Sequence, residues 1–101
     1  EALSLIQRAH QLQPDDPATL DSLGWVYYRL DQPAEALSWL EKAHAVYPDP
    51  EVSAHLGEVL WALGEKRKAR KVWRDALKED PEHDILRETM QRLDTRKGWL
   101  K

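Results

Sequence analysis

The chain has 101 residues, of which 33% are charged, a formal net charge of −3 and no cysteine. This length allows one small domain with a modest core, and the lack of cysteine excludes disulfides, thiolate metal sites and a cysteine nucleophile. The mildly acidic balance argues against nucleic-acid binding, and no apolar run approaches the roughly 20 residues that cross a bilayer, which argues against direct membrane contact by this segment.

Apolar residues recur at helical spacing from the start of the chain. The opening stretch EALSLIQRAH is amphipathic and does not have the form of an export signal, so we expect any signal or lipid anchor to lie outside this segment. Leu20, Leu23 and Tyr27 continue the helical spacing, and prolines separate the elements that follow. The predicted helices cover 1–13, 17–30, 33–47, 51–63, 66–79 and 83–96. Since strands would alternate instead, the pattern predicts an all-α fold.

A set of unlike residues recurs at an offset of 33 positions. The pairs are Pro17 and Pro50, Leu23 and Leu56, Gly24 and Gly57, Leu30 and Leu63, Ala36 and Ala69, Leu40 and Trp73, Ala43 and Ala76, and Pro48 and Pro81. Read back by 34 positions, the second half of this pattern also fits the first residues of the chain. The repeat therefore predicts a half unit at 1–14, full units at 15–48 and 49–81, and a capping helix with a tail at 82–101, all within a longer protein.

The recurring glycines and alanines have a packing explanation. Glycine costs about 1 kcal/mol in a helix, and close packing can offset this cost. Gly24 and Gly57 lie in first helices, where a small side chain lets a second helix approach closely. Because one helical hairpin cannot bury both of its faces, we expect neighbouring hairpins to stack and to form the core between them. Trp73, which takes the place of Leu40, is expected in this core.

Two stretches, LGWVYYRLDQPAEALSWLEKAHAVYP and LGEVLWALGEKRKARKVWRDALKEDP, resemble tetratricopeptide (TPR) repeats. They share the Leu-Gly pair, a large residue three positions later, the alanines of the second helix and the closing proline. Leu20 and Ser53 depart from the tryptophan often found at their position, and Leu60 departs from the usual tyrosine. The stretch HDILRETMQRL resembles a capping helix. The resemblance implies an α-solenoid of helical hairpins.

In the TPR family, the first helices line a concave groove that receives an extended peptide or a helix of a partner. Carried over by alignment of the glycines, the resemblance implies a groove-facing set on three helices. The set is Asp21, Ser22, Trp25, Tyr28 and Arg29 in one unit, Glu51, Ala54, His55, Glu58, Trp61 and Ala62 in the next, and Glu88 and Arg92 on the final helix. We expect Trp25, Tyr28 and Trp61 to form one aromatic patch. The alternative is that these rings are ordinary core spacers.

The charges of this face suggest a partner chemistry. Only Arg29 and Arg92 balance the acidic residues Asp21, Glu51 and Glu58 of this set. The acidic groups favour a partner segment with apolar and basic residues. The Lys and Asn pair with which some TPR domains clamp a terminal carboxylate has no counterpart at these positions.

Other clusters predict no chemistry. The basic run EKRKARKVWR at 65–74 fits a solvated outer helix face, although an anion, an acidic partner or a membrane surface is the alternative. The four histidines lack the HxxxH and HExxH spacings, so we expect no metal site. No phosphate loop, nucleophile elbow or carboxylate pair is present, so we expect neither a cofactor nor an enzyme.

The expected function is a protein-interaction scaffold or adaptor. The alternative is a structural segment that stacks on the rest of its own array or on another copy, because Ala2, Leu5, Ile6 and Ala9 lack a preceding first helix. The stretch at 21–64 also resembles the C-terminal repeats of bacterial TPR lipoproteins, some of which deliver substrates to a periplasmic carboxy-terminal processing protease. That resemblance implies the periplasmic face of the outer membrane, and without it we expect the cytoplasm. The role of Trp99 stays open.

Overall fold

The computed structural model describes residues 2–12 and 16–94, and this part of the chain contains helices and no strand. The helices are α1 (Ala2–Leu12), α2 (Pro17–Arg29), α3 (Pro33–Val46), α4 (Pro50–Ala62), α5 (Lys66–Glu79) and α6 (Asp84–Leu93). The all-α prediction is confirmed. Helix α6 ends at Leu93 rather than at residue 96, because Asp94 has extended backbone. Trp99 and the rest of the tail lie outside the described residues.

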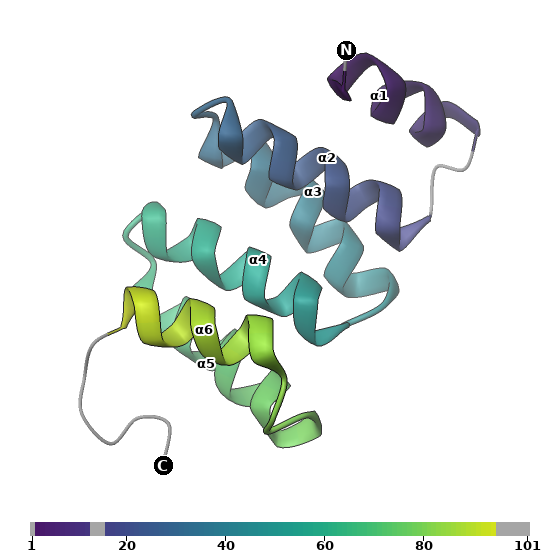
Figure 1. The fold of residues 1–101 in the computed structure, drawn as a ribbon. Helices are drawn as coiled ribbons and strands as arrows, with labels where there is room; N and C mark the ends of the chain where they lie inside the picture. Colours follow the sequence, from purple (N-terminus) through teal and green to yellow (C-terminus); the bar gives the residue numbers. More distant parts are fainter. Residues whose placement is uncertain (1, 13–15, 95–101) are drawn as a thin grey trace.

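The helices form two layers. The first helices α2, α4 and α6 lie side by side in front, the second helices α3 and α5 lie behind them, and α1 flanks α2 (Figure 1). Helix α2 packs on α3 and α4 packs on α5, while α3 and α6 also pack on α4. This is the predicted stack of helical hairpins.

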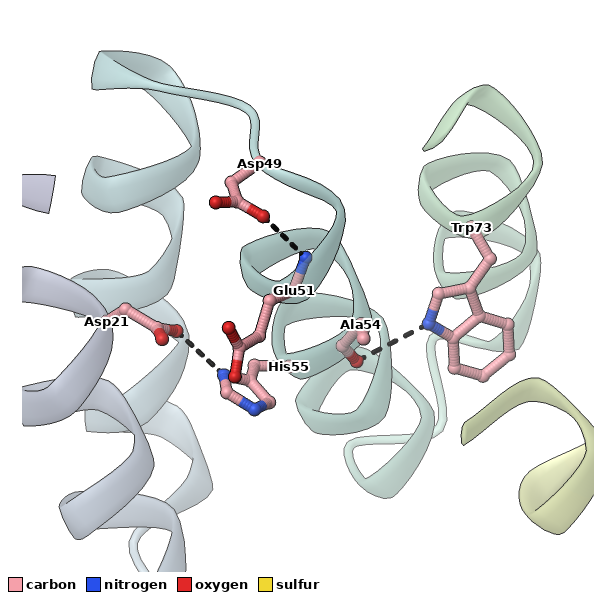
Figure 2. A network of polar contacts seen from close by, with 6 residues as sticks. All are labelled: Asp21, Asp49, Glu51, Ala54, His55 and Trp73. Carbon is pink, nitrogen blue, oxygen red and sulfur yellow. Dashed lines mark hydrogen bonds and ion pairs between the residues drawn. The ribbon is translucent and has the colours of Figure 1, made fainter. Parts of the chain in front are cut away.

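Prolines begin three of the helices. Pro17, Pro33 and Pro50 occupy the first helical positions of α2, α3 and α4. The N–H that proline lacks would have no partner within the helix at that position, and its fixed φ suits the helix start. At α4 the carboxylate of Asp49 also accepts a hydrogen bond from the N–H of Glu51 at 2.8 Å (Figure 2). These caps explain why the predicted starts of α2, α3 and α4, at residues 17, 33 and 51, agree with the structure to within one residue.

The two hairpin turns share one backbone design. Asp31 and Gly64, which are 33 residues apart, both have left-handed backbone with φ of 62° and 83°. In each turn the N–H of the next residue, Gln32 or Glu65, donates to the carbonyl five residues earlier at 2.9 Å. This is the Schellman ending of a helix, for which glycine is the preferred residue. The first hairpin uses an aspartate there at some cost in backbone strain.

The helical glycines mark the closest helix contacts. A Cβ built on Gly24 would lie 2.5 Å from Cγ of Leu40, and one built on Gly57 would lie 2.0 Å from Nε1 of Trp73. Trp73 is 0% exposed, and its Nε1 donates to the carbonyl of Ala54 at 3.4 Å (Figure 2). The predicted close approach at both glycines and the predicted core place of Trp73 are confirmed.

The core lies between hairpins rather than within one. One cluster of buried residues joins four helices. It contains Ala36 and Leu40 of α3, Ala54, Leu56, Val59 and Leu60 of α4, Ala69, Trp73 and Ala76 of α5, and Leu86 and Met90 of α6. A smaller cluster holds Leu20, Ala43 and Val52 with Trp39 against it. At the other end, Leu5 and Leu12 of α1 are 69% and 77% exposed. Stacking therefore supplies the core, as the repeat pattern predicts.

Candidate functional site

An aromatic cluster lies where α2 meets α4 on the first-helix layer. The rings of Trp25 and Tyr28, one turn apart on α2, have centroids 5.1 Å apart. The ring of His55 on α4 stacks on Trp25, with centroids 4.2 Å apart and an interplanar angle of 23°. All three side chains are half-buried. We call Trp25, Tyr28 and His55 the aromatic cluster.

An acid orients the histidine of this cluster. Nδ1 of His55 lies 2.8 Å from Oδ1 of Asp21 (Figure 2). Because a carboxylate only accepts hydrogen bonds, the proton of the imidazole is on Nδ1, and Nε2 is left as an acceptor or, after protonation, as a second donor. Glu51, one turn before His55 on α4, is exposed on the same side of the helix (Figure 2). The site therefore offers flat apolar ring surface with polar groups at its edge.

A second polar group joins all three first helices. Nη2 of Arg92 on α6 donates to Oε1 of Glu58 on α4, and the hydroxyl of Tyr28 on α2 donates to the same carboxylate. Burial, followed by the negative charge and hydrogen bond of Glu58, raises the pKa of Tyr28 above its ordinary value, so the phenol stays protonated and continues to donate at neutral pH. Glu58 itself is 8% exposed.

These contacts correct the expected electrostatics of the face. Of the three acidic residues expected to attract a basic partner, Asp21 is bonded to His55 and Glu58 to Arg92, and Glu51 alone is exposed. The reason is geometric, because both bonds join residues 34 positions apart, which brings an acid of one first helix beside a base of the next. Of the three acids, Glu58 is thus neutralised by Arg92, whereas Asp21 is hydrogen-bonded to the histidine ring and Glu51 faces solvent.

Trp61 also lies differently from the expectation. Its ring stacks on Trp73, with centroids 5.6 Å apart, while the charged groups of Lys66 and Arg70 lie 5.0 and 5.2 Å from the ring centre. Within the described residues no ring contact joins Trp61 to the aromatic cluster. The large indole at 73, where the preceding hairpin has leucine, explains the difference, since it extends to α4 and stacks on Trp61. The expected patch of three rings is thus two separate aromatic groups.

Of the remaining predicted residues, Ala54 is 0% exposed and belongs to the core, because α5 packs against that side of α4, and the others lie at the surface. Ser22 and Arg29 are exposed on α2, and Glu88 is exposed on α6. They make no ion pair within the described residues. His55, in contrast, was predicted only as one residue of a face, and the sequence gives no sign that it stacks on Trp25.

Elsewhere the described residues contain no group of three or more metal-ligating side chains. None of the helices there has the length and apolar character needed to cross a bilayer. The basic run lies on α5, where all of its basic residues except the half-buried Arg70 are exposed, as expected for an outer helix face. Lys71 pairs there with Asp75 at 3.0 Å.

The chain is similar to known proteins in both sequence and structure. Residues 17–50 and 50–83 each match a model of the tetratricopeptide repeat. The chain is 54% identical over 93 residues to a TPR repeat-containing protein of Pseudomonas aeruginosa, which covers 92% of the chain and 16% of that protein. It is 30% identical over 88 residues to human tetratricopeptide repeat protein 21A, covering 87% of the chain and 6% of that protein. The chain thus spans a small part of each of these relatives.

Two solved structures have similar folds. A thermophilic TPR protein of Thermus thermophilus superposes with a TM-score of 0.83 at 25% identity, over 94% of this chain and 49% of that one. The first TPR of Spaghetti (RPAP3), solved with a bound HSP90 peptide, superposes with a TM-score of 0.80 at 18% identity, over 92% of this chain and 75% of that one. The second likeness concerns the fold alone.

Proposed function

The chain belongs to the tetratricopeptide repeat family, and we propose that it is a scaffold that holds an extended peptide or a helix of a partner protein in a groove on the face of α2, α4 and α6. TPR repeats generally mediate protein–protein interactions, and proteins of this fold are generally non-catalytic. In this proposal α1 is the second half of a repeat, α2 with α3 and α4 with α5 are full repeats, and α6 is the cap.

The observation that carries the proposal is the half-buried aromatic cluster. Rigid rings with polar edges give a large contact area at low cost in conformational entropy, which is why such residues often anchor partners. Trp25 is held by ring contacts on two sides, with Tyr28 and with His55, so little order is lost when a partner binds. A contact of this kind supports an affinity of roughly micromolar, about −8 kcal/mol.

The proposed ligand is mainly apolar. Asp21 and Glu58 are already paired, so the exposed carboxylates of Glu51 and Glu88 provide the remaining preference for basic residues. The bound peptide of the RPAP3 structure belongs to that protein, and the proposal here depends on the side chains of this chain.

Affinity capture followed by a matched pair of variants tests the proposal. A partner identified by mass spectrometry with the full-length protein is titrated against the wild type, a Trp25→Ala/Tyr28→Ala variant and a Val46→Ala control, since Val46 is exposed on α3. The double variant should lose at least about 2 kcal/mol of binding, roughly 30-fold, while helical circular dichroism stays unchanged. The control should bind as the wild type does. Equal binding by all three proteins would contradict the proposal that this groove binds the partner.

We propose further that the full-length protein is a bacterial adaptor, lipid-anchored at the periplasmic face of the outer membrane, that delivers substrates to a carboxy-terminal processing protease. The support is the resemblance of the stretch at 21–64 to repeats of such lipoproteins, together with a bacterial relative at 54% identity. Cell fractionation with metabolic lipid labelling, and capture with the protease, test this step. A full-length protein that stays in the cytoplasm without lipid would contradict it.

A structural role is the second candidate. Leu5 and Leu12 on α1 are 69% and 77% exposed, which favours stacking of α1 on another hairpin, from the same array or from another copy. Sedimentation of the chain at high concentration should then show association that a Leu5→Ser/Leu12→Ser variant loses. A monomer with an ordered α1 would exclude self-association.

A further inference from the structure

A groove opens on the other layer of the molecule, between the second helices α3 and α5. It lies beside the link from α3 to α4 and has a volume of about 760 Å³. Tyr47, Pro48 and Val72 contribute apolar surface to it, and Tyr47 is 59% exposed. This volume is within the range of sites that bind ligands of several side chains in size. We call it the second groove.

The repeat explains why the groove exists. At the preceding interface, Leu20 is buried against Ala43, and Trp39 packs on the same cluster. The positions 33 residues after Leu20 and Trp39 hold Ser53 and Val72, and both line the second groove. Two large side chains at one interface are therefore replaced by two smaller side chains at the next. The groove is the space that they leave between otherwise equivalent hairpins.

The floor of the groove contains a polar group without a protein partner. Ser53 is 1% exposed, and its hydroxyl makes no hydrogen bond to any other group within residues 2–12 and 16–94. A buried hydroxyl without a partner is unfavourable, because it has given up its bonds to water.

The rim of the groove is acidic. Asp49, Asp75, Glu79 and Asp80 all line it, and among the described residues Glu79 and Asp80 have no ion-pair partner. The one lysine of the lining, Lys71, donates to Asp75 at 3.0 Å.

The remaining base of the lining is His44. Burial lowers its pKa, although the charge of Asp75 opposes the shift, so its ring is neutral at physiological pH. The groove therefore combines an apolar wall, a buried hydroxyl and more carboxylates than basic groups in its lining, although Lys71, Lys78 and Arg74 of α5 lie near Asp75.

We propose that the second groove is a docking site for an extended segment of a partner protein that places an apolar side chain next to lysine or arginine. The apolar side chain would fill the space between Val72 and Tyr47, and the cation would lie against Glu79 and Asp80. This site is independent of the aromatic cluster on the opposite layer. It gives the chain two binding surfaces with different ligand chemistry.

The test uses a matched pair of peptides. The 15N-labelled chain is titrated with acetyl-Leu-Lys-Leu-Arg-amide and with acetyl-Leu-Glu-Leu-Glu-amide, and binding is measured from the amide shifts of residues that line the groove. The basic peptide should shift Ser53, Val72 and Ala76 and bind at least about tenfold more tightly than the acidic peptide. Equal binding of both peptides, or no shifts at these residues up to millimolar peptide, overturns the proposal.

Variants then locate the site. Ser53→Leu places the residue of the preceding repeat in the groove and should weaken binding at least about tenfold. Glu79→Lys reverses an exposed rim charge without touching the core, so it tests the site even if Ser53→Leu alters folding, and it should weaken binding about fivefold or more. Trp25→Ala should leave this binding unchanged, so the two proposed surfaces fail or succeed separately. Binding that survives Glu79→Lys, or groove shifts that grow with protein concentration alone, overturns the assignment of the groove to a basic partner segment.

Discussion

Replacing Gly57 with alanine tests whether close helix packing determines the stability of this stack. The new Cβ would lie 2.0 Å from Nε1 and 2.4 Å from Cε2 of Trp73. Atoms cannot remain at such distances, so the indole or the helix axis has to move. Because Trp73 is rigid and 0% exposed, it has no solvent into which it can swing. The substitution therefore forces a rearrangement of the contact between α4 and α5.

The net effect follows from three opposing contributions. Alanine is favoured over glycine in a helix by about 1 kcal/mol. Overpacking of a filled core costs about 1–3 kcal/mol. Displacing the indole also removes its hydrogen bond to the carbonyl of Ala54, a loss of about 1 kcal/mol for a bond of 3.4 Å. We expect the free energy of unfolding to fall by about 1–3 kcal/mol and the Tm to fall by roughly 5–20 °C.

Urea unfolding followed by far-UV circular dichroism measures this change. A second variant, Gly57→Ala/Trp73→Leu, uses the smaller residue found at the equivalent position of the preceding hairpin and makes room for the new methyl group. The two substitutions should be coupled by at least about 1 kcal/mol, so that the double variant is less destabilised than the sum of the single ones. If Gly57→Ala alone is as stable as the wild type, the argument for close packing at this position is refuted.

Three further predictions concern other contacts. Arg92→Ala leaves Glu58 without its cation and should lower the free energy of unfolding by about 1–2 kcal/mol, measured in urea melts. Arg92→Lys keeps the positive charge and should retain most of the wild-type stability. An equal loss of stability in both variants would contradict a role for the charge. Asp31→Gly removes a left-handed non-glycine residue and should raise stability by about 1 kcal/mol, and a decrease would count against strain at this turn. Burial lowers the pKa of His44 below 6.5, so the unfolded chain binds more protons, and stability should fall as the pH drops through 6.5 and level off below the lowered pKa. His44→Gln should reduce this dependence, and an NMR titration of the His44 ring with a midpoint at or above 6.5 would rule it out.

The helices could be predicted because their signals are local. Proline at the first position and the recurring small residues depend on backbone geometry within one hairpin, and the structure agrees with them at Pro17, Pro33 and Pro50. The end of α6 could not be predicted in this way. Asp94 leaves the helix and its carboxylate lies 2.8 Å from Nε of Arg70, a contact between distant residues that no periodicity reveals.

For a similar reason, the sequence did not predict which side chains contact one another on the first-helix layer. The repeat pattern identified a shared face, but the offset between neighbouring hairpins decides which residues meet. That offset brings His55 onto Trp25 and Asp21, and it gives two of the three expected acids partners within the chain. The ring contact of Trp61 could not be predicted, because whether the indole at 73 reaches Trp61 depends on how deeply it packs and not on sequence spacing.

The bonds from Asp21 to His55 and from Glu58 to Arg92 connect successive first helices at the same interval along the chain. Any rotation of one hairpin against the next separates the atoms of at least one of these bonds. The superhelical pitch is therefore coupled to ionic strength, because salt screens the attraction between partly exposed charged groups such as Arg92 and Glu58. In low salt the array resists bending, and in high salt it becomes more compliant.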